Sequence, residues 1–261
     1  MKTTKIGTFK ILSKTDNIID NIATAARVCT QKQDKASPET NYKLVKNLLA
    51  RGHYAMIEFA DMTVEFSNVS RGFTHEMVRH RLCSFGQQST RYVDESDLHV
   101  VLPPHKDEHQ RTKRSSKPIE YFQLIEEMYK SLRESGYKLE DARQVLPIAT
   151  QSQIVVKANL REWRHIFEMR CDFYAHWEIR SVMLRLLKWA KQDIPLIFDD
   201  FSFFQSTKTN QIYAKKIMSK SQIEDALSHY LKCNPDVDLN LLLVSSKSKP
   251  VKIEIESRLL P

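Results

Sequence analysis

The sequence predicts an α+β fold, and three observations support this. Segments with the alternating apolar pattern of strands are interspersed with segments that carry helical patterns and capping residues. The chain has 261 residues, 41% hydrophobic and 28% charged, which is typical of a globular protein with a substantial core. No apolar run approaches the roughly 18 residues of a membrane-spanning helix. We therefore expect packed strands and helices and no membrane partner.

The first hundred residues predict two strands and three helices. Alternating apolar residues indicate strands at residues 5–12 and 62–69. Capping and stop signals place the helices at residues 16–29, with Asp16 as the cap, at 38–51, ended by Gly52, and at 73–82. An extended segment at 92–102 then leads to a Pro-Pro pair.

The rest of the chain predicts more helices and a change of composition near its end. The basic segment 105–118 is expected to be a solvated loop rather than a binding arm. The expected helices are 119–135, 139–145, 159–170 with Asn159 as N-cap, and 175–192, with a strand at 152–157. After about residue 206 the chain becomes Lys-rich, so we expect a main domain, 1–205, and a C-terminal appendage, 206–261. Within the appendage a helix at 223–231 and strands at 239–244 and 251–255 are expected.

Charge and cysteine content narrow the function classes. The formal net charge is +8, which favours an anionic partner such as nucleic acid, a nucleotide or a phosphorylated cofactor. The cysteines lie far apart without a CxxC pair, which argues against a zinc site and a disulfide scaffold. They are Cys29, Cys83, Cys171 and Cys233. The N-terminal segment lacks the apolar region of a secretory signal, so a cytoplasmic location is expected.

One stretch, RHRLCSFGQQSTRY at residues 79–92, gathers most of the chemistry. Successive helical side chains point about 100° apart, so its first three residues would fan around a helix end. Hydroxyls, amides and guanidinium groups together suit phosphate oxygens and the edges of heterocycles. Cys83 is disfavoured as a nucleophile, because no histidine with an orienting partner adjoins it. Ser89 is read as a phosphate-binding hydroxyl and not as a nucleophile with His80 as base, because no G-x-S-x-G elbow surrounds it.

The pattern Arg-His-Arg, seven residues, Ser, one residue, Arg resembles the signature of the flavin-dependent thymidylate synthases. Four further segments are similar to elements of that family in the same order. They are GHYAMIEF at 52–59, THEMVRHR at 74–81, DARQVLP at 141–147 and NLREWRHIFEMRCDFYAHWEIR at 159–180. The resemblance covers roughly residues 5–205.

This resemblance implies a fold and an activity. The implied fold is a mixed sheet packed with helices plus a helical subdomain, in a homotetramer whose subunits share active sites. The implied reaction is reductive methylation of dUMP to dTMP. Methylenetetrahydrofolate would give the carbon, NADPH the reducing equivalents, and bound FAD would carry the hydride. Neither a metal nor nucleic acid is implied.

The resemblance also implies a role for particular residues. Arg170 is implied as the catalytic residue that polarises the uracil ring. The residues implied in FAD binding are Arg79, His80, Arg81, Gln87, Asn159, Arg161 and His165. The residues implied in dUMP binding are Glu76, Arg79, Gln87, Gln88, Ser89, Thr90, Arg91, Arg143 and Arg170, with Arg91 and Arg143 on the phosphate.

Helix geometry and family departures bear on these roles. Arg161 and His165 lie about 40° apart on an ideal helix and can face one ligand, whereas Arg170 lies about 180° from Arg161. Four positions depart from frequent family residues: His165 replaces Asn, Glu76 replaces Gln, Gln87 replaces Glu, and Ala55 replaces a hydroxyl residue.

Two other classes compete with this reading. The excess of basic residues and the basic segment 105–118 are compatible with a nucleic-acid-binding protein, although the sequence contains no recognisable nucleic-acid-binding module. The four substitutions at positions 55, 76, 87 and 165 are also compatible with a member of this family that binds flavin but does not catalyse the reaction. Flavin colour and dTMP formation discriminate among the three.

Overall fold

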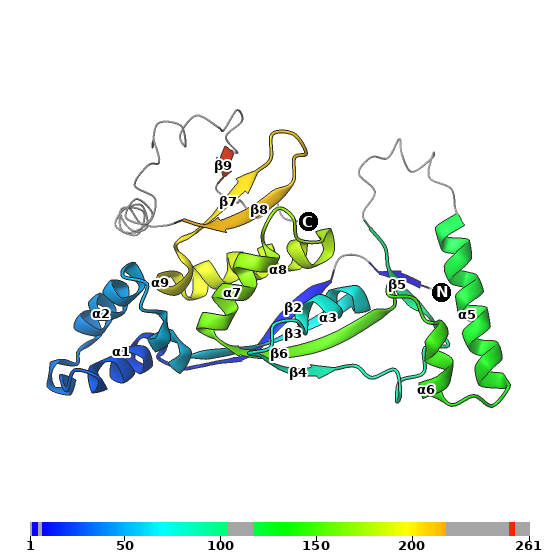
Figure 1. The fold of residues 1–261 in the computed structure, drawn as a ribbon, viewed down its shortest axis with the longest axis horizontal. Helices are drawn as coiled ribbons and strands as arrows, with labels where there is room; N and C mark the ends of the chain where they lie inside the picture. The colour runs from blue at the N-terminus through cyan, green and yellow to red at the C-terminus, as the bar shows by residue number, and fades with distance from the viewer. Residues whose placement is uncertain (1, 5–6, 104–116, 218–250, 254–261) are drawn as a thin grey trace, which may run out of the picture. The chain divides into compact units, whose positions relative to one another are not determined.

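The computed structural model describes residues 2–4, 7–103, 117–217 and 251–253 (Figure 1). Its contacts divide the chain into two compact units. Unit 1 consists of Met1–Ser13, Met62–Ala158 and Trp177–Val182, and unit 2 of Lys14–Asp61, Asn159–His176 and Met183–Pro261. Both units contain helices and strands, which confirms the predicted α+β class. Across the described ranges, no helix has the length and apolar character required to cross a membrane.

The centre of unit 1 is a four-stranded sheet. Its strand order is β2 (Thr8–Lys14), β3 (Asp61–Ser70), β6 (Gln151–Asn159) and β4 (Ser84–Gln87), as Figure 1 shows. Alternate residues of the two central strands are fully buried, because successive strand residues face opposite sides of a sheet. The strands expected at 62–69 and 152–157 are confirmed, whereas the first strand starts and ends later than expected.

Helix α3 (Arg71–Met77) follows β3 directly and is shorter than expected. The expected helix ran to residue 82, but Val78 is the C-cap and its N–H bonds the carbonyl of Thr74. His80 N–H then donates to the Met77 carbonyl at 3.1 Å, a tight turn that redirects the chain towards β4. The Arg-His-Arg triplet therefore follows the helix and does not form its last turns.

The remaining elements of unit 1 are an N-terminal strand and the elements within residues 99–145. Helix α5 (Lys117–Glu134) packs against α6 (Leu139–Ala142) and the 3-10 turn η3 (Arg143–Val145). The helix expected at 119–135 is confirmed, whereas the one expected at 139–145 is divided into α6 and η3. β1 (Lys2–Thr4) pairs in parallel with β5 (His99–Val101). Only β5 is a strand within the segment that was expected to be extended over 92–102.

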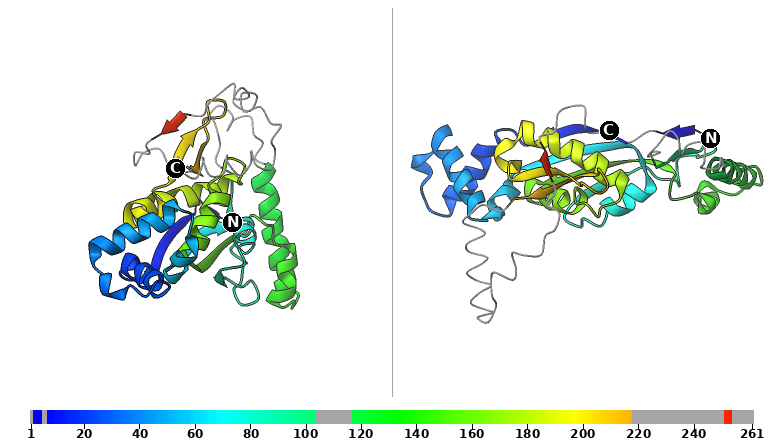
Figure 2. Two further views of the ribbon diagram at one scale, coloured as in Figure 1. Left: turned by 60° about the vertical axis from the view of Figure 1, so that its left-hand side comes forward. Right: turned by 90° about the horizontal axis from the view of Figure 1, so that it is seen from above.

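Unit 2 begins with two helices, α1 (Ile18–Val28) and α2 (Pro38–Ala50), which lie side by side (Figure 2). The expected Asp16 cap is wrong: the N-cap of α1 is Asn17, in a left-handed conformation with φ 48° and no side-chain cap bond. Gly52, with φ +72°, follows α2 as predicted, since glycine tolerates positive φ. The 3-10 turns η1 (Gln33–Lys35) and η2 (Tyr54–Phe59) complete this part.

The rest of unit 2 carries the second set of candidate residues. Helix α7 (Leu160–Arg170) has the predicted bounds and cap. Helix α8 (Trp177–Asp193) begins in unit 1 and continues in unit 2, where α9 (Pro195–Phe198) follows it. A three-stranded sheet has the order β8 (Ile212–Lys216), β7 (Phe201–Gln205) and β9 (Val251–Ile253), of which β7 and β8 were not expected.

The expected loop 105–118 falls almost entirely outside the described residues, as do the helix at 223–231 and the strand at 239–244. The division of the chain near residue 206 stays a prediction.

A buried ion pair anchors α7 within unit 2. Arg164 is 4% exposed and donates to both carboxylate oxygens of Asp200, at 2.8 Å and 2.5 Å. Its guanidinium also lies 5.0 Å from the ring centre of Tyr54. A bidentate, stacked arginine holds its helix in one orientation, because a guanidinium is planar and its hydrogen-bond donors are fixed. The exposed side chains of α7 are thereby presented in a defined direction.

Candidate functional site

In unit 1, the candidate substrate residues 87–91 lie where β4 ends in a turn. β4 pairs with β6 in antiparallel fashion, and Gln88 N–H extends the pairing by donating to Gln153 O at 2.9 Å. The chain then turns at Ser89, whose carbonyl accepts from Val93 N–H at 3.0 Å and whose hydroxyl accepts from Arg91 N–H at 3.3 Å. The sheet therefore fixes the position at which the hydroxyl and guanidinium groups emerge.

The two candidate phosphate arginines meet around Glu140. Arg91 Nε donates to Glu140 Oε2 at 2.9 Å, while Arg143 Nε donates to the Glu140 carbonyl at 3.1 Å. Arg143 Nη1 also donates to Thr90 Oγ1 at 3.4 Å. The structure thus brings Arg143 to Thr90, which lies 53 positions earlier in the sequence beside Arg91. Glu140 was not predicted, and its place three residues before Arg143 in a short helix was the available signal.

The adjacent glutamines are each held by a buried side chain. Gln87 Nε2 donates to Thr74 Oγ1 at 2.8 Å, and Gln88 Nε2 donates to Glu95 Oε1 at 3.0 Å. Thr74 is 0% and Glu95 6% exposed, whereas both glutamines are half-buried. No other described residue bonds to either amide oxygen. Each amide therefore presents its oxygen as the free acceptor.

Glu95 is the centre of a small charged network. Burial raises the pKa of Glu95 above its usual range, while the bond from Gln88 and the charge of Arg71 act in the opposite direction. Burial also lowers the pKa of Arg71, which Glu95 opposes and the like charge of Arg143 reinforces. Neither Arg71 nor Glu95 was predicted, because no motif or periodicity marks them.

The residues of α3 and the triplet differ in exposure. Arg79 and Arg81 are exposed and His80 is 5% exposed, while Glu76 on α3 is half-buried. The triplet therefore has a buried imidazole between two exposed guanidinium groups.

In unit 2, α7 presents the remaining candidates. Asn159 Oδ1 accepts from Glu162 N–H at 2.8 Å and so caps the helix. Arg161 and His165 are both exposed, as their predicted common face requires, and Arg161 Nη1 donates to Glu58 Oε1 at 2.6 Å. Arg170 is the half-buried last residue of the helix.

A cavity of about 430 Å³ in unit 1 adjoins the arginine cluster. It is lined by Arg91, Tyr92, Arg133, Lys138, Leu139 and Glu140. Three cations face one carboxylate, and the exposed Tyr92 ring lies 5.9 Å from the Arg91 guanidinium. This lining suits an anionic ligand that carries a flat ring.

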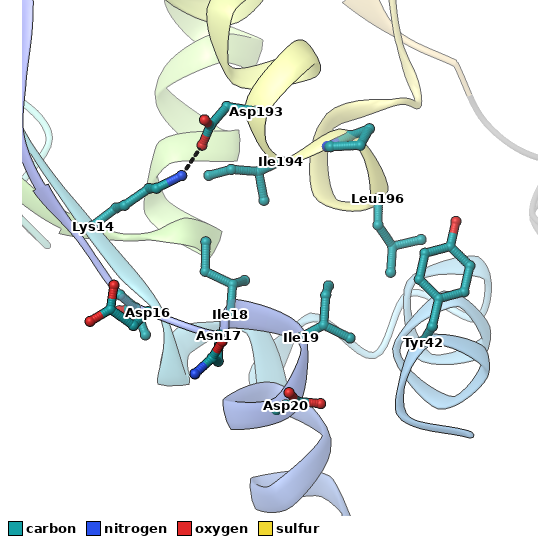
Figure 3. A pocket seen from close by; sticks show the side chains of 12 residues that line it. Lys14, Asp16, Asn17, Ile18, Ile19, Asp20, Tyr42, Asp193, Ile194 and Leu196 are labelled. Carbon is teal, nitrogen blue, oxygen red and sulfur yellow. Dashed lines mark hydrogen bonds and ion pairs between the residues drawn. The ribbon is translucent and has the colours of Figure 1, made fainter. Parts of the chain in front are cut away.

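A second cavity, of about 520 Å³, lies in unit 2 (Figure 3). Its walls come from residues 14–20, Tyr42 and residues 193–196, and Lys14 bonds Asp193 across it. None of the candidate site residues lines this cavity. Isoleucine and leucine side chains line it together with Lys14 and three aspartates, so it lacks the paired guanidinium groups of the arginine cluster.

The fold is that of an α+β protein, and its candidate site brings together guanidinium, hydroxyl and amide groups, the chemistry typical of nucleotide-binding proteins. The comparisons with known proteins are more specific. The family model described as thymidylate synthase complementing protein matches residues 10–196. A flavin-dependent thymidylate synthase of Corynebacterium diphtheriae is 34% identical over 217 residues, 74% of this chain and 86% of the relative. One of Mycobacteroides abscessus is 34% identical over 192 residues, 68% and 77% of the two chains.

Solved structures share the fold. A UMP/dUMP methylase, PolB, from Streptomyces cacaoi, bound with 5-Br dUMP, aligns with a TM-score of 0.66 at 22% identity, covering 76% of this chain and 96% of that one. Thymidylate Synthase X from Helicobacter pylori, with FAD and dUMP, aligns with a TM-score of 0.61 at 20% identity, covering 74% and 98%. The chain belongs to the family of flavin-dependent thymidylate synthases.

Proposed function

We propose that the protein catalyses the reductive methylation of dUMP to dTMP, with methylenetetrahydrofolate as carbon donor, NADPH as reductant and FAD as cofactor. The observation that carries this proposal is the convergence of Arg91, Thr90 and Arg143 at the end of β4, in a chain of this family. Two guanidinium groups beside a hydroxyl suit the phosphate of a nucleotide.

The phosphate would share Arg91 with Glu140, which bonds the same guanidinium at 2.9 Å. Arg143 has its own fixed partners, the Glu140 carbonyl and the Thr90 hydroxyl, and is half-buried. We therefore propose that Arg143 orients the phosphate, and that Arg91 exchanges its bond to Glu140 for a bond to the phosphate. Ser89 and Thr90 add hydroxyl groups to the same turn.

The uracil ring needs a cation because negative charge must build on its oxygens and nitrogen before its carbon attacks. A permanently charged guanidinium stabilises that charge in the way an oxyanion hole does. We assign this role to Arg170, and we assign Glu76, Arg79, Gln87 and Gln88 to contacts with the nucleotide.

The residues proposed for FAD fit an anionic cofactor. Arg79, Arg81 and Arg161 are exposed guanidinium groups, and the pyrophosphate of FAD is the kind of ligand they bind. His80, Asn159, His165 and Gln87 complete the proposed flavin set. FAD supplies hydride transfer when it is bound, while these side chains bind and orient it.

Assembly and location are part of the proposal. We propose a homotetramer with shared active sites, a helical subdomain in each chain and a cytoplasmic location. Size-exclusion chromatography with light scattering measures the assembly directly.

The decisive experiment is dTMP formation by purified protein supplied with dUMP, methylenetetrahydrofolate and NADPH. We expect a yellow protein, with the flavin absorbance at about 450 nm, and NADPH oxidation that depends on dUMP. A colourless protein that takes up no added FAD contradicts the proposal. A yellow protein without dTMP formation supports the non-catalytic flavin-binding reading instead.

The role of Arg170 has its own test. We expect Arg170→Ala to lose dTMP formation by at least about a hundredfold, the scale for loss of one transition-state donor, while the protein stays yellow. The matched control is Arg51→Ala, which removes an exposed arginine at the end of α2 and should keep wild-type turnover. Wild-type-like turnover of Arg170→Ala would contradict the assignment.

A further inference from the structure

We propose that Glu95 is a positioning residue for substrate recognition, because it fixes which atom of Gln88 faces the nucleotide. This inference rests on the proposed function, since Gln88 meets dUMP only if that function holds. The observation behind it is the 3.0 Å bond from Gln88 Nε2 to Glu95 Oε1.

The bond sets the orientation of the amide. In this bond the carboxylate oxygen of Glu95 accepts, so Gln88 turns its NH2 group towards Glu95. The amide oxygen is then directed elsewhere, and no other described residue bonds to it. Gln88 thus offers the ligand an acceptor.

Glu95 itself is fixed from several directions. Its N–H donates to the hydroxyl of Tyr129 at 3.4 Å, and Tyr129 is fully buried on α5. Its side chain is 6% exposed, and this burial raises its pKa, while the bond from Gln88 and the charges of Arg71 and His99 act in the opposite direction. Arg71 in turn starts α3 and donates its N–H to Thr150 O at 2.9 Å. The backbone of Glu95 is therefore bonded to α5, and its buried carboxylate bonds Gln88, which fixes the position of the amide.

The amide oxygen of Gln88 can accept hydrogen bonds only from particular groups of dUMP. The ring N–H and the sugar hydroxyl are donors, whereas the ring carbonyl oxygens are acceptors and would be repelled. Gln88 in this orientation favours a nucleotide that places a hydrogen-bond donor opposite the amide oxygen. A site built around a hydrogen bond discriminates against ligands that cannot make it, because a polar group would be left unpaired.

The test is a double-mutant cycle of Gln88→Ala and Glu95→Ala in the flavin-containing enzyme. We expect each single variant to raise the KM for dUMP about tenfold, with kcat within about twofold of wild type. The double variant should resemble Gln88→Ala alone, because Glu95 acts through Gln88. A hundredfold increase, the product of the two, would mean independent effects and would overturn the proposal.

Controls separate this result from a general loss of structure. Glu39→Gln alters an exposed carboxylate that pairs with Lys43 on α2, and should leave the KM unchanged. If Glu95→Ala does not fold, Glu95→Gln is used in the same cycle, because it keeps the size of the side chain. An active wild type whose Glu95 variants retain a normal KM for dUMP overturns this inference alone, whereas an inactive wild type overturns the proposed function.

A dideoxy analogue of dUMP identifies the donor. If the Glu95 variant loses affinity for dUMP but not for the analogue, Gln88 accepts from the sugar hydroxyl. If it loses affinity for both equally, Gln88 accepts from the ring N–H.

Discussion

A buried carboxyl group stands on the same helix as the proposed flavin residues. Glu162 is 5% exposed, and burial raises its pKa above the ordinary 4.5, with the charge of His165 acting in the opposite direction. The folded protein therefore holds this proton to a higher pH than the unfolded chain does. Between the two pKa values the folded state binds more protons, so stability falls as the pH rises.

We expect Glu162→Gln to remove this dependence. Relative to wild type, the variant should gain stability as the pH rises above 4.5, by about 1.4 kcal/mol for each pKa unit of the shift. Urea unfolding at several pH values measures the difference. Glu168→Gln, which alters an exposed carboxylate 3.3 Å from Lys216, is the control. A constant difference between Glu162→Gln and wild type across this range would contradict the prediction.

Sequence patterns predicted part of the side-chain arrangement, but not the side-chain pairs that depend on the fold. The common exposed face of Arg161 and His165 follows from helical periodicity, which is a local property. The bond between Arg91 and Glu140 joins residues 49 positions apart, and that between Gln88 and Glu95 depends on a turn. Such pairs depend on tertiary packing, which periodicity does not encode.

At the scale of elements, one buried cap fixes the start of α3. Ser70 Oγ accepts from Phe73 N–H at 3.1 Å and donates to Glu178 Oε2 at 2.5 Å, while Ser70 N–H donates to Glu178 Oε1 at 2.6 Å. Glu178 is 1% exposed. The start of α8 thus holds the start of α3, which leads to the Arg-His-Arg triplet.

We expect Ser70→Ala to destabilise the protein by about 2–3 kcal/mol, because it removes a cap and leaves a buried carboxylate short of a donor. Ser37→Ala removes the exposed cap of α2 and should cost only about 1 kcal/mol. Urea unfolding compares the two variants. Equal losses would show that Glu178 adds nothing to the cap.

Elements with strong local signals were predicted well. α2, with Pro38 inside its start and Gly52 after its end, and α7, with its Asn159 cap, have nearly the predicted bounds. The β7–β8 hairpin was missed, because its strands show no regular alternation and its turn uses Asn210 at φ 54° without a glycine. The end of α3 was misplaced, because the sequence 78–82 remains compatible with a helix and only the path into β4 ends it.

For the molecule as a whole, cofactor binding should appear as added stability. A ligand that binds only the folded state stabilises it by about 2.7 kcal/mol at a concentration of 100 times its Kd. We expect FAD to raise the Tm of flavin-free protein and Arg161→Ala to reduce that rise. The variant alone should change the Tm little, because the exposed Arg161–Glu58 pair contributes only about 0–1 kcal/mol. An identical FAD-induced rise in both proteins would contradict the place of Arg161 at the flavin.

Glu140 gives the arginine cluster a property that the number of cations alone would not suggest. Arg91 already holds a carboxylate, so an anion that binds there replaces one negative charge with another. Less net charge is neutralised than at a bare guanidinium, and fewer counterions are released to the solvent. The affinity of the cluster for an anion should therefore depend less on ionic strength than two unpaired arginines would predict. The cluster should prefer ligands that form more hydrogen bonds with Arg91 than the Glu140 carboxylate does.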